Sequence, residues 1–163
     1  MSTFDVTIIG SGPGGYVAAI RCAQLGMKTA LIEKYPTLGG TCLNVGCIPS
    51  KALLDSSEHF HNATHTFATH GIKVEKVEAD LAQMIARKDD VVAQTCNGVK
   101  FLMDKNNITV YQGVGSFVDK TTIAIADTDG NTTTVTTKNV IIATGSKPNF
   151  FPGMEPDKDR IIT

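Results

Sequence analysis

Three short runs of apolar and β-branched residues predict the buried strands of a parallel sheet. They are residues 4–9, 29–32 and 140–143. Between the first two runs, residues 16–25 contain helix formers with small residues on one side, and Gly26 stops the helix. The order of strand, helix and strand predicts a βαβ unit at the start of the chain.

Longer periodic segments predict further helices. Over residues 80–105 apolar side chains recur at helical spacing, which predicts either a pair of helices or a single helix weakened at residues 97–98. Another helix is expected to begin within residues 39–51 and to run toward residue 60. Residues 71–77 predict a polar connection between these helices.

In the last third of the chain the pattern changes to short threonine-rich runs separated by turn residues. Residues 117–118, 122–125 and 132–138 predict an antiparallel β-meander over about residues 114–138. Residues 150–163 carry two prolines and one glycine, and they predict a linker. The chain is therefore expected to have an α/β fold, a Rossmann-like parallel sheet with helices plus a small antiparallel meander.

The turn after the first strand contains the pattern G-x-G-x-x-G at Gly10, Gly12 and Gly15, and an acid, Glu33, follows the next strand. In this context Gly10 makes the tight turn, Gly12 lets the backbone approach a pyrophosphate and Gly15 lets helix and strand pack closely. The helix N-terminus favours phosphate. The motif predicts dinucleotide binding, with Glu33 accepting from both hydroxyls of an adenosine ribose. The alternative for Glu33 is a solvated strand-end acid. Replacing Glu33 by Ala is predicted to weaken binding with little effect on thermal stability.

Two of the four cysteines, Cys42 and Cys47, stand among glycines ahead of a predicted helix. In an ideal helix their Cα atoms would lie roughly 8 to 9 Å apart, beyond the usual disulfide span of about 4.4 to 6.8 Å. A bridge therefore needs a distorted turn, which Gly46 permits, and a strained, accessible disulfide exchanges readily with thiols. Lys51, one helical turn after Cys47, is placed to stabilise its thiolate. The alternative is a pair of reduced, buried cysteines.

The remaining cysteines and the histidines are assigned no chemistry. Cys22 and Cys96 are expected to be packing residues. The four histidines lie together downstream of the cysteine segment: His59, His61, His65 and His70. His61 and His65 could share a helical face, but no carboxylate or cysteine completes a ligand set. They are expected to face solvent, and no metal is expected.

Composition argues against two kinds of partner. A length of 163 residues suits one domain. Fifteen basic and 16 acidic residues give a net charge of −1 without a basic cluster, so neither nucleic acid nor a membrane surface is indicated. No apolar run could span a bilayer, and the first residues lack a signal-peptide pattern. The expected location is the cytoplasm, with a mature organelle protein as the alternative.

Three features together resemble the flavin-dependent pyridine nucleotide–disulfide oxidoreductases: the cysteine segment, the glycine motif with Glu33, and residues 143–145 at a late strand end. Within this family, residues 42–53 are most similar to the dihydrolipoamide dehydrogenases, because glutathione and large thioredoxin reductases usually have a basic residue where Ser50 stands. The resemblance covers the whole chain but only the N-terminal part of the family's proteins. The sequence is therefore expected to be an excised fragment.

The resemblance implies an FAD-binding domain over residues 1–150, followed by a linker over residues 151–163 toward an absent NAD-binding domain. Thr144 to Ser146 would close the cofactor site from a neighbouring strand end, and Gly115 would meet the adenine through its backbone. The implied cofactor-binding residues are Gly10, Gly12, Gly14, Gly15, Glu33, Thr41, Lys51, Gly115, Thr144, Gly145 and Ser146.

The resemblance also implies a redox role for the two cysteines. Cys42 would be the interchange sulfur attacked by a dihydrolipoyl thiolate, and Cys47 the charge-transfer sulfur beside the flavin ring, where Lys51 would pair with the developing negative charge. The reduced flavin would pass a hydride to NAD⁺ on the absent domain. The implied partner is the lipoyl domain of a 2-oxoacid dehydrogenase or glycine cleavage complex, and the parent is expected to be a homodimer.

Two alternatives stay open at this point. One is another disulfide reductase of the same family, of the glutathione, thioredoxin or mercuric reductase type. The other is a non-catalytic dinucleotide-binding module. The isolated chain is expected to be inactive or nearly so, because no histidine is placed to serve as a base for Cys42.

Overall fold

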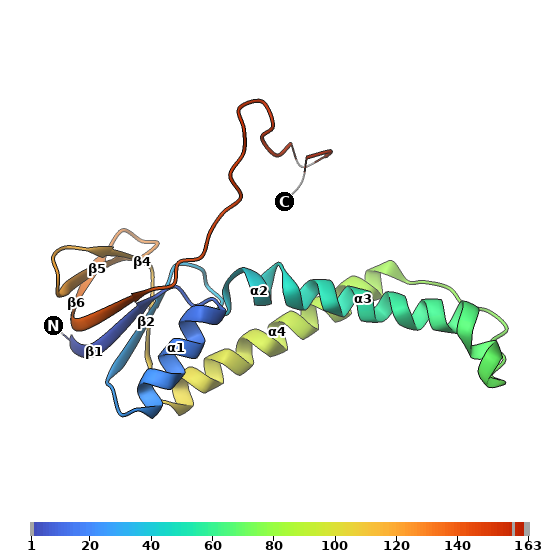
Figure 1. Ribbon diagram of the computed structural model, residues 1–163, viewed down its shortest axis with the longest axis horizontal. Helices are drawn as coiled ribbons and strands as arrows, with labels where there is room; N and C mark the ends of the chain where they lie inside the picture. Colours follow the sequence, from blue (N-terminus) through green and yellow to red (C-terminus); the bar gives the residue numbers. More distant parts are fainter. Residues whose placement is uncertain (1, 158, 162–163) are drawn as a thin grey trace.

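A six-stranded sheet lies at one end of the molecule (Figure 1), whose computed structural model describes residues 2–157 and 159–161. Its strands are β1 (Ser2–Ile9), β2 (Thr29–Glu33), β3 (Thr109–Gln112), β4 (Val114–Phe117), β5 (Thr122–Ala126) and β6 (Thr132–Ile142). Their spatial order is β3-β2-β1-β6-β5-β4. β3, β2, β1 and β6 are parallel, whereas β5 is antiparallel to both β6 and β4. The predicted α/β class, a parallel sheet with an antiparallel addition, is confirmed.

Four helices accompany this sheet: α1 (Pro13–Gln24), α2 (Gly40–Asn44), α3 (Cys47–His61) and α4 (Leu81–Lys105). A π-helical turn, η1 (Asn62–Thr66), and a 3₁₀ turn, η2 (Phe67–His70), follow α3. α3 and α4 pack against each other in an arm that extends away from the sheet (Figure 1). Within the described residues, no helix combines the length and apolar character needed to cross a membrane.

The segment with helical spacing forms one helix, not two. The Asp80 side chain caps α4 by accepting a hydrogen bond from the backbone N–H of Gln83 at 3.0 Å. A glycine inside a helix costs about 1 kcal/mol relative to alanine. Near Gly98 this cost is opposed by the burial of Cys96, Val99 and Met103 against the sheet and α1. Burial of a single helix face therefore decides between the two predicted alternatives.

Two apolar clusters hold the layers together. The first joins β1 and β2 to α1 and α4, with Val6, Ile8 and Leu31 meeting Ala19 and Met103. The second contains residues of β1, β2, β5 and β6: Phe4, Ile9, Ala30, Ile32, Ile123, Ile125 and Val135. Burial of these side chains, at about 25 cal/mol per Å² of apolar surface, is the main stabilising contribution to the fold.

The last strand of the meander and the last parallel strand are one strand, which corrects the strand boundaries predicted from the sequence. Residues 132–138 and 140–143 were expected to form two strands, but β6 is continuous from Thr132 to Ile142. Its first half pairs antiparallel with β5, while the strand pairs parallel with β1 from Ser2↔Val135 to Ile9↔Ile142. β6 is therefore shared between both parts of the sheet.

Candidate functional site

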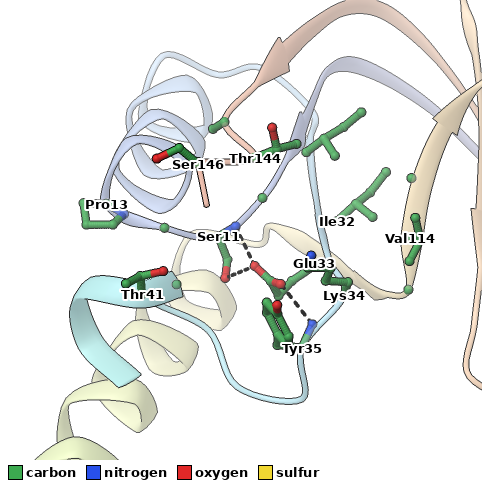
Figure 2. Close-up of a pocket in the computed structure, with 18 residues that line it drawn as sticks. Ser11, Pro13, Ile32, Glu33, Lys34, Tyr35, Thr41, Val114, Thr144 and Ser146 are labelled. Atoms are coloured by element: carbon green, nitrogen blue, oxygen red, sulfur yellow. Dashed lines mark hydrogen bonds between the residues drawn. The ribbon is translucent and has the colours of Figure 1, made fainter. Parts of the chain in front are cut away.

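A cavity of about 310 Å³ lies where the carboxyl ends of β1, β2 and β6 meet (Figure 2). Ligands of open α/β sheets bind at this edge, between strand ends. The predicted site residues that line the cavity are Gly10, Gly12, Glu33, Thr41, Gly115, Thr144, Gly145 and Ser146. Gly14, Gly15, Lys51, Cys42 and Cys47 do not line it. The structure thus brings eight of the predicted residues together from five separate segments of the chain.

The glycine turn is built by close backbone contacts. Gly10 has φ +101°, and a Cβ there would lie 2.3 Å from the carbonyl oxygen of Ala143 on the neighbouring strand end. A Cβ on Gly15 would lie 1.8 Å from the carbonyl oxygen of Gly10. At Gly12, by contrast, a Cβ would meet nothing within 4 Å. Gly10 and Gly15 are therefore required by packing, while Gly12 leaves open space beside the cavity that it lines.

The N-terminus of α1 faces this turn. α1 begins at Pro13 after Gly12, and no side chain caps it. The first N–H groups of a helix have no intrahelical partner, and with the helix dipole they favour an anion such as a diphosphate. The geometry of strand, glycine turn and uncapped helix fits a dinucleotide.

The Glu33 carboxylate is buried within this site, with only 5% of the residue exposed. Its Oε2 accepts hydrogen bonds from the Ser11 backbone N–H at 2.8 Å and from the Ser11 hydroxyl at 2.6 Å. Its Oε1 accepts from the backbone N–H of Tyr35 at 2.9 Å. These contacts (Figure 2) rule out the alternative of a solvated strand-end acid. They occupy three of the roughly four acceptor positions of a carboxylate, so Glu33 can serve both ribose hydroxyls only if the Ser11 hydroxyl turns away.

Glu33→Ala is now expected to lower stability as well as affinity, which corrects the prediction made from the sequence. The substitution leaves the buried hydroxyl and N–H of Ser11 without their acceptor, and an unsatisfied buried group costs about 1–3 kcal/mol. We expect a loss of about 2 kcal/mol or more in the free energy of unfolding, measured by urea denaturation, and weaker ADP binding in calorimetric titration. Lys34→Ala, an exposed neighbour, is the control for stability. Unfolding curves that coincide with wild type would show that the Glu33 contacts contribute nothing.

The start of β4 also lines the cavity. Gly113 donates its N–H to the carbonyl oxygen of Glu33 at 2.8 Å, which starts β4 beside the end of β2. A Cβ on Gly115 would lie 3.3 Å from the Ile32 side chain, so the backbone of β4 lies close to β2. Gly115 thus reaches the cavity through its backbone, as the resemblance implied, although its contact with adenine stays a prediction.

The cysteine segment is folded into two helices with a break between them. α2 contains Cys42 and α3 begins at Cys47, while Gly46 between them has φ −123° and ψ −108°, outside helical values. The chain therefore has the local distortion that a Cys42–Cys47 bridge needs. All four cysteines are free thiols in the structure, so the bridge stays a prediction. A hydrogen bond with the Cys47 thiol, with a smaller contribution from burial, raises the pKa of Cys42.

The other candidate residues lie apart from the cavity. Cys96 is buried and Cys22 packs against the same core cluster, as predicted for packing residues. Lys51 is exposed, and among the described residues it forms no ion pair. The rings of His61 and His65 stack with centroids 4.6 Å apart at the exposed end of the helical arm. No group of three or more metal-binding side chains occurs in the described part of the chain.

Sequence reasoning missed Ser11 and Asn44. Ser11 occupies a variable position of the glycine motif, and its fully buried hydroxyl bonds to Glu33. The Asn44 amide donates to the carbonyl oxygens of Leu38 at 3.1 Å and Gly40 at 2.9 Å, which fastens α2 to the preceding turn. The only signal for Ser11 was a polar residue inside a motif whose other positions are glycine or proline, and the only signal for Asn44 was its place between the two cysteines.

Comparison with known proteins agrees with this geometry. The family model described as "Pyridine nucleotide-disulphide oxidoreductase" matches residues 4–163. A leghemoglobin reductase from Vigna unguiculata and dihydrolipoyl dehydrogenase 1, mitochondrial, from Arabidopsis thaliana are each 52% identical over 98% of this chain, which covers 30% and 31% of their lengths. A dihydrolipoyl dehydrogenase from Cupriavidus necator is 50% identical over 97% of this chain and 35% of its own length. The chain thus spans about a third of the length of these curated relatives.

A solved structure shows the same fold. The Cu(II) complex of the HOCl-induced flavoprotein disulfide reductase RclA from Escherichia coli superposes with a TM-score of 0.73 and 28% identity, covering 93% of this chain and 31% of that one. The strand, glycine turn, uncapped helix and buried acid define a dinucleotide-binding protein of the Rossmann-like class. More specifically, the chain belongs to the pyridine nucleotide-disulphide oxidoreductase family.

The cofactor of this family is FAD, and the cavity fits its adenosine and diphosphate portion. The backbone at Gly12 is open, the N-terminus of α1 is uncapped and an acid lies at the end of β2. These are the donors, space and acceptor that an adenine dinucleotide requires. Gly10, Gly12, Thr41 and Glu33 are the residues placed to hold it.

Proposed function

We propose that this chain is the FAD- and disulfide-bearing part of a dihydrolipoamide dehydrogenase, which oxidises protein-bound dihydrolipoamide with NAD⁺ as the final acceptor. The observation that carries the proposal is the position of Cys42. Its helix, α2, starts at the dinucleotide cavity with Gly40 and Thr41, and α3 begins at Cys47 directly after the break at Gly46. About 50% identity to dihydrolipoyl dehydrogenases over nearly the whole chain supports the substrate class.

The two cysteines would exchange with the substrate as follows. A dihydrolipoyl thiolate attacks Cys42 of the Cys42–Cys47 disulfide, forming a mixed disulfide and releasing Cys47 as a thiolate. The second substrate thiol displaces Cys42, so lipoamide leaves as a cyclic disulfide and the protein keeps two electrons in its dithiol. Lys51, one turn after Cys47, would stabilise the thiolate. FAD, when bound, supplies the chemistry that takes these electrons and delivers a hydride to NAD⁺.

The same proposal covers the organisation of the protein and its partners. Residues 1–150 would be the FAD-binding domain, and residues 151–163 would lead to an NAD-binding domain. The partner would be the lipoyl domain of a 2-oxoacid dehydrogenase or glycine cleavage complex, and the assembly a homodimer. The proposed compartment is the cytoplasm, with a mitochondrial matrix as the alternative because several relatives are named as mitochondrial.

A second candidate is another disulfide reductase of the same family. It is favoured by the similarity to leghemoglobin reductases and to the reductase RclA, whose names give other activities. A half-reaction separates the candidates. The air-oxidised chain is mixed in turn with dihydrolipoamide, glutathione and reduced thioredoxin, and the appearance of Cys42 and Cys47 thiols is followed by labelling. We expect dihydrolipoamide to be the fastest reductant; faster reduction by either of the others would favour the second candidate.

The disulfide itself is a separate prediction. In air-oxidised protein we expect Cys42 to pair with Cys47, because Gly46 between their two helices provides the distorted turn that a bridge needs. Cys96 is buried in the core and Cys22 is partly buried against it, and both are expected to stay reduced. The measurement is peptide mapping after alkylation under denaturing, non-reducing conditions. Full labelling of Cys42 and Cys47 in the oxidised protein would contradict the redox proposal.

A further inference from the structure

We propose that Ser11 is a positioning residue that couples occupancy of the dinucleotide cavity to the reactivity of Cys42. This inference rests on the proposed function of the cavity and goes beyond it, since the cysteines do not line the cavity. It depends on a chain of short contacts that begins at Glu33 and ends at α2.

Ser11 joins three parts of the site through a side chain that is fully buried. Toward the cavity, its hydroxyl and backbone N–H both donate to Oε2 of Glu33, at 2.6 and 2.8 Å. Toward the cysteine segment, its backbone carbonyl and its hydroxyl both accept the N–H of Gly39, at 3.0 and 3.2 Å. Ser11 therefore links the position of the Glu33 carboxylate to the position of Gly39.

Gly39 transmits this contact to α2 because it is the N-cap of that helix, with φ +104°. The next residue, Gly40, packs so closely on the glycine turn that a Cβ there would lie 2.7 Å from the Cα of Gly12. Asn44 fastens the same turn from the other end of α2 by donating to the carbonyl oxygens of Leu38 and Gly40. The first turn of α2 is therefore joined to the glycine turn through Gly39 and Gly40, and Asn44 ties the rest of this short helix to its own preceding turn.

Cys42 lies in the middle of this five-residue helix, one residue after Thr41, which lines the cavity. A ligand that engages Glu33 and Thr41 together would restrain α2 and with it the approach of Cys42 to Cys47 and to an external reagent. An effect of one site on another requires that the ligand differ in its contacts between two arrangements. In the first arrangement the Ser11 hydroxyl donates to Glu33. In the second, a ribose hydroxyl has displaced the Ser11 hydroxyl from Glu33.

The probe is ADP, which has the adenosine and diphosphate of the cofactor but no flavin. The reduced chain is treated with iodoacetamide with and without saturating ADP, and alkylation of Cys42 is followed by peptide mapping. We expect ADP to slow alkylation of Cys42 at least about fivefold, the lower end of typical coupling between sites. In Ser11→Ala the ratio of the alkylation rate without ADP to the rate with ADP should fall below about twofold. Folding should persist in this variant, because both backbone contacts of Ser11 remain.

Thr137→Val is the matched control. It also removes a buried hydroxyl, one that donates to the carbonyl oxygen of Asn139 at 2.8 Å, but it lies in β6 away from the cavity. We expect this variant to keep the wild-type ratio even if its stability falls. An equal loss of the ratio in both variants would show that Ser11 acts only through stability and would overturn the inference.

The remaining outcomes separate the inference from the proposed function. If wild-type protein binds ADP in calorimetric titration but alkylation of Cys42 does not change, the coupling is overturned while the dinucleotide site stands. If the ratio survives in Ser11→Ala, the role of Ser11 is overturned. If the wild-type chain does not bind ADP at all, the proposed cavity function and the coupling both fail.

Discussion

Gly15→Ala is expected to lower the free energy of unfolding by about 3 kcal/mol or more, the upper range for overpacking. The added methyl carbon would lie 1.8 Å from the carbonyl oxygen of Gly10 and 2.9 Å from its carbonyl carbon. Both atoms belong to the backbone of the tight turn, which is itself pressed against Ala143. Neither can move aside as a flexible side chain would, so α1 must separate from the end of β1.

The matched control for this substitution is Gly14→Ala in the same helix. A Cβ on Gly14 would meet nothing within 4 Å, and alanine is favoured over glycine in a helix by about 1 kcal/mol. We therefore expect Gly14→Ala to leave stability unchanged or to raise it slightly. Urea denaturation followed by circular dichroism measures both variants, and calorimetry with ADP measures the site. Equal stability of the two variants would contradict the close helix–strand packing assigned to Gly15.

The 163-residue chain by itself is expected to reduce NAD⁺ much more slowly than a full-length relative when each is supplied with dihydrolipoamide and excess FAD. The expected loss of rate is about 100- to 10,000-fold, the range for loss of a general base. The base would have to activate the substrate thiol beside Cys42. His59, the histidine nearest to the cysteines in sequence, lies about 18 Å along α3 from Cys47 at the helical rise. His59, His61, His65 and His70 are all exposed.

A positioned nicotinamide contributes further, because it converts hydride transfer into an effectively intramolecular step. The chain covers 35% of the Cupriavidus necator dihydrolipoyl dehydrogenase, which is a suitable full-length reference. Cys47→Ser in the chain shows whether any residual rate passes through the disulfide. Turnover of about 1 per second or more that Cys47→Ser abolishes would show that the chain is an enzyme in its own right.

Local signals were sufficient for much of the fold. The first strand, helix and second strand were predicted over residues 4–9, 16–25 and 29–32, and β1, α1 and β2 lie there within a few residues. Hydrophobic periodicity and glycine breaks depend only on neighbours in the chain, which is why they are legible without a structure. The helix predicted to run toward residue 60 likewise ends at His61.

Predictions failed or stayed open where distant segments decide the outcome. β6 is one strand because it pairs with β1 from Val135 to Ile142 and with β5 from Thr132 to Thr136, and β1 is more than 120 residues away in the chain. α4 is unbroken because one face of it is buried against the sheet and α1. Register and burial of this kind depend on partners that no local window contains.

The sequence by itself determined the class of this protein and predicted the residue types of its site. The glycine turn, the acid after the second strand and the cysteine pair each require particular residues at particular spacings, and spacing along the chain is what a sequence records. Only the tertiary structure decided that Glu33 is buried and held by Ser11, and that α2 is joined to the glycine turn. These features arise from hydrogen bonds and backbone contacts between segments 22 to 28 residues apart. Folding brings such segments together through the burial of the whole core, and no local pattern specifies which atoms then meet.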